Sequence, residues 1–209
     1  MGPPSDTRVL ALHGLRLKGF APIDIVADTL SLDVDDVGEQ LAALLADGLV
    51  QHRDGRVSGF SLTAAGRIEH HRLLAEELDG LGMRATVERC YGRFLEQNDE
   101  LLELCTAWQL REVDGASVVN DHGDPTYDST IIDRLAVLDD RIQPVCAELG
   151  EVLARLARYG PNLRRARDRV EAGEGGYFTA PMLPSYHTVW FELHEDLLTT
   201  LGLERTGAS

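Results

Sequence analysis

The fold of the N-terminal part of this chain is decided by residues 33–67, DVDDVGEQLAALLADGLVQHRDGRVSGFSLTAAGR. Apolar side chains recur at three- and four-residue steps from Val34 to Leu45, which predicts a helix with one buried face. Gly48 is placed to end that helix in a left-handed conformation. Two short extended runs then flank Asp54-Gly55, a pair that favours a two-residue turn between antiparallel strands. The stretch therefore predicts a helix followed by a β-hairpin.

Two more helices are predicted before this stretch. The first runs from Asp6 to Lys18, with Ser5 or Asp6 as its N-cap and Gly19 closing it. The second has Pro22 at its first position and runs to about Leu30. Because another helix opens after the hairpin, the predicted order is three helices, a hairpin and a helix.

This order resembles the winged helix-turn-helix of MarR-type transcription regulators over about the first 80 residues. The resemblance is carried by Gly48-Leu49-Val50, Asp54-Gly55-Arg56 and Leu62-Thr63-Ala64-Ala65-Gly66-Arg67. It implies that the third helix lies in the major groove of double-stranded DNA, that the hairpin is a wing, and that the chain is a homodimer. The cationic and amide side chains available for such contacts are Arg16, Lys18, Gln40, Arg53, Arg56 and Arg67.

The charge of the chain opposes DNA binding. The net charge is −15, and residues 1–80 hold 7 basic and 13 acidic residues. The outward positions of the third helix include Asp35, Asp36 and Glu39, so that only Gln40 offers a base-reading amide. These carboxylates also suit a solvated helix start, where the helix dipole favours negative charge. Any DNA contact must therefore be local.

A second resemblance suggests a different role. HGLRLKGFA (13–21) and SGFSLTAAGR (58–67) are similar to winged-helix segments of bacterial phosphoenolpyruvate-utilising phosphotransfer proteins. This resemblance implies a protein-interaction or regulatory module for a metabolic enzyme, without nucleic acid. The acidic third helix favours this alternative.

Residues 81–209 are predicted to form a helical dimerisation and effector-binding module. One helix is expected from about Met83 to Leu110, with Asn98 in the middle of its apolar stripe. A second is expected from about Thr130 to Tyr159, ended by Gly160-Pro161, and a last one begins after Pro184 with Ser185 as cap. The inward residues expected are Val87, Tyr91, Phe94, Leu101, Cys105 and Trp108 in the first helix and Tyr186, Val189, Trp190, Phe191, Leu193, Leu197, Leu198 and Leu201 in the last.

A polar loop is predicted from about Val113 to Ser129. Its string Asn120 to Asp128 has enough oxygen donors for a divalent cation but lacks the spacing of a calcium loop. The alternative is that Asp128 or Ser129 caps the next helix and that Asp124-Pro125 is a turn.

Candidate ligand-binding residues of this module are Asn98, Trp108, Gln109, Arg111, Tyr127, His187, Trp190 and His194. Such a mixture suits an apolar pocket with a few orienting polar groups, and equally a well-satisfied helical core. His187 and His194 lie seven positions apart, which does not match a chelating pair, so hydrogen-bonded core or pocket histidines are the main interpretation. The arginines clustered around Arg164 and Arg167 are typical of a solvated helix face, with anion binding as the alternative.

The fold class predicted is mainly α, with a winged helix-turn-helix domain (1–80) and a helical bundle (81–209). The leading hypothesis for the function is a ligand-responsive, dimeric DNA-binding transcription regulator with an unknown small-molecule effector. A metal-dependent enzyme using His122, His187 and His194 is a third hypothesis, but no complete catalytic arrangement is visible, so we predict no enzyme, metal or cofactor. No membrane span or secretory signal is evident, and the odd number of cysteines suits a reducing compartment, so a cytoplasmic location is expected.

Overall fold

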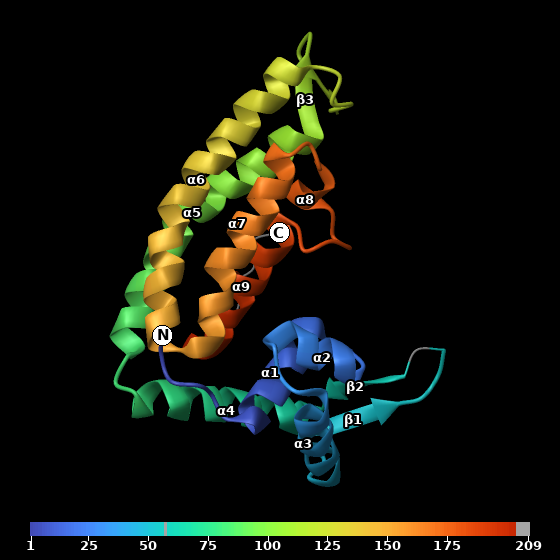
Figure 1. Ribbon diagram of the computed structural model, residues 1–209, viewed down its shortest axis with the longest axis vertical. Coiled ribbons are helices and arrows are strands. Elements are labelled where there is room, and N and C mark those ends of the chain that lie inside the picture. The colour runs from blue at the N-terminus through green and yellow to red at the C-terminus, as the bar shows by residue number, and fades with distance from the viewer. Residues whose placement is uncertain (57, 204–209) are drawn as a thin grey trace. The chain divides into compact units, whose positions relative to one another are not determined.

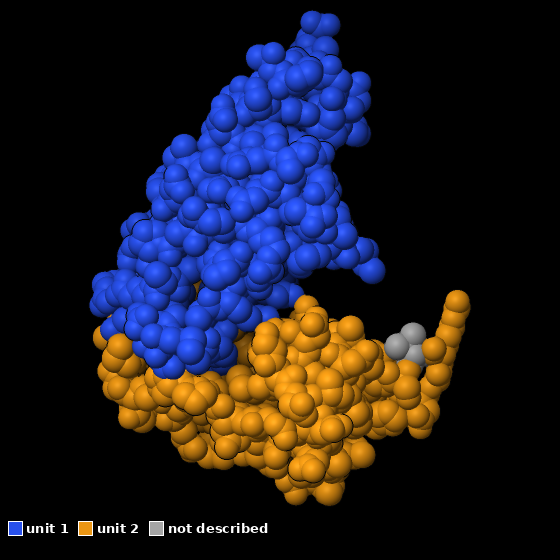
Figure 2. All heavy atoms as spheres, viewed as in Figure 1, with its two compact units in different colours: residues 1–2, 86–194 blue, residues 3–85, 195–209 orange. Residues whose placement is uncertain are grey.

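The computed structural model describes residues 1–56 and 58–203. The described chain is mainly helical and divides into two compact units, which Figure 2 shows in separate colours. Unit 1 comprises residues 1–2 and 86–194, and unit 2 comprises residues 3–85 and 195–209. The C-terminal segment thus belongs with the N-terminal helices.

Unit 2 contains the predicted order of three helices, a hairpin and a helix. These are α1 (Thr7–Lys18), α2 (Ile23–Leu30), α3 (Val34–Ala46), β1 (Val50–Arg53), β2 (Gly59–Leu62) and α4 (Ala64–Gly80), labelled in Figure 1. Local capping explains where the helices begin, because the side chains of Asp6, Asp33 and Thr63 accept hydrogen bonds from backbone N–H groups of α1, α3 and α4. Pro22 is the N-cap of α2, one position earlier in the helix than predicted.

The hairpin of unit 2 has a longer loop than predicted. Arg53 pairs with Gly59, so the loop spans residues 54–58 and the predicted two-residue turn at Asp54-Gly55 is wrong. The physical reason lies in β2. Phe60 exchanges two backbone hydrogen bonds with Ala21, of 3.0 and 2.8 Å, and this pairing holds β2 in register independently of the turn.

The core of unit 2 is formed largely by apolar residues at the predicted helical spacing, but Val34 and Leu45, predicted on the buried face of α3, are 48% and 42% exposed because they lie at the edges of that face. Its buried members are Ala11, Leu12, Leu15, Ala21, Val26, Ala27, Val37, Leu41, Leu44, Val50 and Leu62. Burial of these side chains on one face of each helix stabilises the packing of three short helices, which would be only marginally stable in isolation.

Unit 1 is built on long helices. Its elements are α5 (Arg84–Gln109), β3 (Leu110–Val113), β4 (Ala116–Val119), α6 (Pro125–Val152), the 3₁₀ helix η1 (Ala154–Arg158), α7 (Tyr159–Glu171), α8 (Gly176–Thr179) and α9 (Tyr186–Leu201). The first residues of α5 and the last residues of α9 belong to unit 2. Figure 1 shows α5 and α6 running side by side, and Glu148 of α6 forms ion pairs with Arg89 and Arg93 of α5.

The predicted loop from Val113 to Ser129 is wrong over its first part, which forms a second hairpin. Val113 pairs with Ala116, so Asp114 and Gly115 make a two-residue turn. Both have positive φ, 53° for Asp114 and 77° for Gly115, as a type I′ turn requires. The Asp-Gly turn that the first hairpin lacks therefore occurs here.

Two predicted helix boundaries of unit 1 are also wrong. Asp124 is the N-cap of α6 and accepts hydrogen bonds from Thr126 and Tyr127, so neither Asp128 nor Ser129 caps this helix. Pro125 follows it within the first turn, where a missing N–H costs nothing. Gly160-Pro161 likewise lies in the first turn of α7 and does not end the preceding helix.

The core of unit 1 follows the predicted stripes of α5 and α9, except that Tyr91 is half-buried and Phe191 is 46% exposed. The predicted inward residues Leu197, Leu198 and Leu201 are buried but belong to unit 2. The large buried side chains include Phe94, Leu101, Leu104, Leu138, Ile142, Leu149, Tyr159, Phe178, Tyr186 and Leu193. The three cysteines are buried here too, and burial raises the pKa of Cys105 and Cys146 to about 12 and that of Cys90 to about 11. These thiols stay protonated and serve as small apolar side chains.

Over residues 1–56 and 58–203, none of the helices combines the length and the apolar character that a bilayer span requires.

Candidate functional site

The residues proposed for DNA contact all lie in unit 2, but they differ in exposure and in the contacts that their side chains make. Arg53 and Arg56 are exposed on the hairpin, and within the described part of the chain neither forms an ion pair. Arg16 instead pairs with Glu195 at 3.2 Å. Arg67 is exposed but donates to the backbone oxygen of Leu62 at 3.2 Å.

The other two candidates differ in exposure. Lys18 is exposed at the end of α1, and Gln40 is half-buried on α3.

The exposed face of α3 is acidic and apolar. Asp35, Asp36 and Glu39 are exposed in its first half, and Val34 and Leu45 are 48% and 42% exposed. No arginine or lysine lies within α3. This helix alone has no cation with which to approach a phosphate backbone.

A groove runs beside the start of α3 in unit 2. Its volume is about 700 Å³, and it is lined by Pro22, Ile23, Asp24, Val34, Asp35, Gly38, Glu39, His52, Ser58, Gly59 and Phe60. Three carboxylates border an apolar floor, so the groove is better suited to an apolar or cationic group than to an anion.

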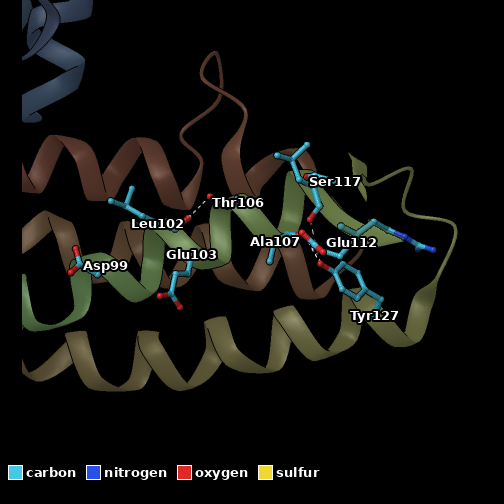
Figure 3. A pocket seen from close by; sticks show the side chains of 10 residues that line it. Asp99, Leu102, Glu103, Thr106, Ala107, Glu112, Ser117 and Tyr127 are labelled. Atoms are coloured by element: carbon cyan, nitrogen blue, oxygen red, sulfur yellow. Dashed lines mark hydrogen bonds between the residues drawn. The ribbon is translucent and has the colours of Figure 1, made fainter. Parts of the chain in front are cut away.

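Two of the predicted ligand residues, Arg111 and Tyr127, line one cavity of unit 1 (Figure 3). The cavity has a volume of about 660 Å³ between the end of α5, the second hairpin and the start of α6. The Arg111 guanidinium lies 5.8 Å from the centre of the Tyr127 ring. The Tyr127 hydroxyl already uses its hydrogen, which it donates to the backbone oxygen of Ala107 at 3.0 Å.

The other predicted ligand residues of unit 1 do not line this cavity. The Trp190 indole N–H donates to the Asn98 oxygen at 3.1 Å, so the predicted inward amide of Asn98 has a side-chain partner in the core. His194 Nε2 lies 3.2 Å from the Tyr91 hydroxyl. His187 is half-buried, and desolvation lowers its pKa. Gln109 is exposed at the end of α5.

Trp108 belongs to a second cavity of unit 1, together with a histidine and an aspartate. This cavity has a volume of about 530 Å³ and is lined by Trp108, His122, Asp128, Ile132, Val170, Gly173, Gly175, Gly176, Thr179 and Ala180. His122 Nδ1 lies 2.9 Å from Asp128 Oδ2, and the His122 ring lies 4.4 Å from the Trp108 ring between centroids. The His122–Asp128 pairing was not foreseen, because the polar loop gave no indication of which side chains meet.

A buried cluster of titratable groups in unit 2 was missed by sequence reasoning. His13, His70 and Asp196 are each fully buried. His13 Nδ1 lies 3.2 Å from His70 Nε2, and His13 Nε2 lies 3.0 Å from Asp196 Oδ2. The signal for His13 was its place inside the apolar run Val9 to Leu15, whereas Asp196 lies too far along the chain to be paired with it by spacing.

The arginine cluster of α7 pairs largely with carboxylates of unit 1. Arg164 and Arg167 each lie 3.2 Å from the buried carboxylate of Asp139. Burial raises the pKa of Asp139, against hydrogen bonds from Gln143 and Tyr186 and the charges of the two arginines. The prediction of a solvated helix face is therefore wrong for Arg167, whose side chain is 15% exposed and pairs with a buried carboxylate.

Among residues 1–56 and 58–203, no group of three His, Cys, Asp or Glu side chains is placed to hold a metal ion. Comparisons with protein-family models, with curated proteins and with solved structures found no match.

Proposed function

We propose that this chain is a dimeric, ligand-responsive transcription regulator of the cytoplasm whose unit 2 is a MarR-like winged helix-turn-helix. The order of α1, α2, α3, the β1–β2 hairpin and α4 supports this proposal, because it is the order of elements in that domain class. The single observation that carries DNA contact is the pair of exposed arginines on the hairpin, Arg53 and Arg56.

The distribution of ion pairs supports the hairpin as the main part of unit 2 in the proposed DNA contact. Most other arginines of unit 2 are neutralised locally, since Arg8 pairs with Asp47, Arg16 with Glu195, Arg72 with Glu69 and Glu76, and Arg84 with Asp79. Arg53 and Arg56 can therefore approach phosphates without first giving up a carboxylate partner. The acidic face of α3 opposes tight binding, so the proposed affinity is modest and specific to a favourable site.

The number of arginines that can contact phosphates sets the salt dependence of DNA binding. Two hairpin arginines in each of two protomers would neutralise about four phosphates, which gives a slope of log K against log salt of about −3.6. A much steeper slope would require further cations of unit 2, either Lys18 and Arg67 or the arginines that form ion pairs.

A gel-shift experiment with the DNA upstream of the chain's own gene tests this proposal. We expect retardation at about 50 mM salt that weakens steeply by about 200 mM. The variant R53Q/R56Q should lose most of this binding, whereas R89Q/R93Q, which removes the same charge from α5, should keep it. No retardation at low salt, or equal losses in both variants, would overturn the proposal.

A second function is favoured by the acidic, partly apolar face of α3 and the groove beside it. In this alternative, unit 2 binds a protein partner, such as a phosphotransfer enzyme, and no nucleic acid. A partner that stays bound at high salt, is lost in V34D, and is recovered without enrichment of genomic DNA would select this alternative.

The effector-binding part of the proposal rests on the cavities of unit 1. Their volumes of about 660 and 530 Å³ lie in the range of roughly 300 to 1,000 Å³ that is usual for small-molecule sites. The cavity beside Trp108 combines apolar and small residues with a few polar groups, which is the composition expected of a site that selects a ligand. The lining of the larger cavity is mostly polar and includes the carboxylates of Asp99, Glu103 and Glu112.

A further inference from the structure

We propose that the cavity beside Trp108 and His122 in unit 1 binds a small, uncharged, largely apolar molecule that donates one hydrogen bond, from a hydroxyl, to His122. This inference deepens the effector part of the proposed function, because it names the site and the chemical class of its ligand. It is carried by the geometry of three side chains and by the walls of the cavity.

The tautomer of His122 follows from its partners. Asp128 Oδ2 lies 2.9 Å from His122 Nδ1, and a carboxylate only accepts hydrogen bonds, so Nδ1 carries the proton. The Asn120 amide nitrogen lies farther from Nδ1, at 3.3 Å, and its two hydrogens have the closer acceptors Asp128 Oδ1 and the Trp108 backbone oxygen. In the neutral imidazole, Nε2 is then the acceptor. A ligand that meets this nitrogen must donate to it.

Asn120 holds the His122–Asp128 pair in place. Its side chain is 4% exposed, and its amide group donates to Asp128 Oδ1 at 2.9 Å and to the backbone oxygen of Trp108 at 3.2 Å. Its backbone N–H donates to the oxygen of Gln109 at 2.8 Å. The aspartate is thus oriented from one side by a buried amide and from the other by the imidazole, so that the orientation of the histidine ring is fixed in turn.

The backbone at His122 supports a role beyond packing. Its φ is 59°, in the left-handed region that residues other than glycine adopt rarely. Such a conformation persists where the surroundings impose it, and here it brings the ring to 4.4 Å from Trp108 and within reach of Asp128.

The walls of the cavity define the rest of the ligand. Ile132, Val170 and Ala180 are apolar, and a Cβ added to Gly175 would lie 3.0 Å from Trp108. Asp128 is the carboxylate of the lining. An anion would be repelled by this group, whereas an apolar ring or branched chain with one donor would satisfy both the walls and the imidazole.

Three six-membered-ring probes of similar size separate these contributions. Cyclohexanol donates and accepts, cyclohexanone only accepts, and cyclohexanecarboxylate is an anion. Binding is followed at pH 8 by the indole N–H signals of Trp108 and Trp190 in nitrogen-15 NMR spectra, assigned with the variant W190F. We expect cyclohexanol to shift the Trp108 signal and to bind about tenfold more tightly than cyclohexanone, the ratio that one hydrogen bond confers. The carboxylate should not bind.

Two variants of the full chain complete the test. His122→Asn removes the imidazole but keeps a residue that tolerates positive φ, and it should abolish the preference for cyclohexanol. Asp121→Asn in the same loop, outside the cavity lining, should leave the preference intact. The proposal is overturned if no probe shifts Trp108, if cyclohexanol and cyclohexanone bind equally, or if His122→Asn changes nothing. Because no DNA is present, these outcomes are independent of the gel shift, and failure of either experiment is distinguishable from failure of the other.

Discussion

Gly66 packs so closely against Leu49 that a Cβ on Gly66 would lie 1.8 Å from the Leu49 carbonyl oxygen. Thr63 strengthens the same junction, because its hydroxyl donates to the oxygen of Gly48 at 2.8 Å and accepts from the Gly66 N–H at 3.0 Å. Two of the three motifs that carry the resemblance to winged-helix regulators, Gly48-Leu49-Val50 and the stretch from Leu62 to Arg67, are therefore in contact. They join the end of α3 to the start of α4 across the hairpin.

The substitution Gly66→Ala should destabilise unit 2 by about 3 kcal/mol, because the new methyl group meets backbone that cannot yield. Gly80, the last residue of the same helix, has open space around it, with nothing within 4 Å of an added Cβ, so Gly80→Ala should change the stability by no more than about 0.5 kcal/mol. Urea unfolding of both variants measures the difference. Equal midpoints would show that the close approach to Leu49 is absent.

The adjacent residues Glu195 and Asp196 should differ sharply in their effect on stability. Asp196 is fully buried, contacts His13 and accepts from the Thr200 hydroxyl at 3.2 Å, so Asp196→Ala should cost roughly 3 kcal/mol. Glu195 has a 15% exposed side chain and pairs with the 37% exposed Arg16, so Glu195→Ala should cost less, about 1 kcal/mol. Thermal or urea denaturation of the two variants compares them. A loss for Asp196→Ala no larger than for Glu195→Ala would contradict the buried cluster.

Removing the Asn98 side chain should show how much stability is lost when the Trp190 indole N–H has no acceptor. Asn98→Ala leaves the Trp190 N–H without its acceptor, and we expect a loss of about 1 to 3 kcal/mol. Asn162, on the surface of α7, accepts from Arg165 in an exposed pair, so Asn162→Ala is a matched control with little effect. If both variants unfold at the same urea concentration, the Asn98–Trp190 bond does not contribute to stability.

The stability of the protein should depend on pH through His187. Desolvation lowers its folded-state pKa below the ordinary value of 6.5, so the unfolded state binds a proton more readily. This contribution to stability is complete above pH 6.5 and is lost as the pH falls through the folded-state pKa. His187→Asn removes it, so the advantage of the native chain over the variant should shrink between pH 7.5 and 5. A difference that stays constant over this interval would show that His187 is not desolvated.

The sequence alone was sufficient to predict the helices and the hairpin of unit 2. Their signals are local: Asp33 caps α3, Gly48 follows that helix with a φ of 72°, and the buried face of α3 repeats every three or four residues. Interactions of this kind involve residues close in the chain, so their pattern can be read without a fold. The hairpin loop could not, because Ala21, far along the chain from Asp54-Gly55, sets the register of β2.

Only the tertiary structure decided which distant side chains meet. His13 and Asp196 lie at opposite ends of the chain and yet approach to 3.0 Å in one core, and the residues of α9 on either side of position 194 belong to different units. His122, Asp128 and Asn120 were visible as a polar string, but their pairing depends on backbone φ and on the end of α5. Contacts of this kind depend on the three-dimensional packing of whole helices, which local periodicity does not encode.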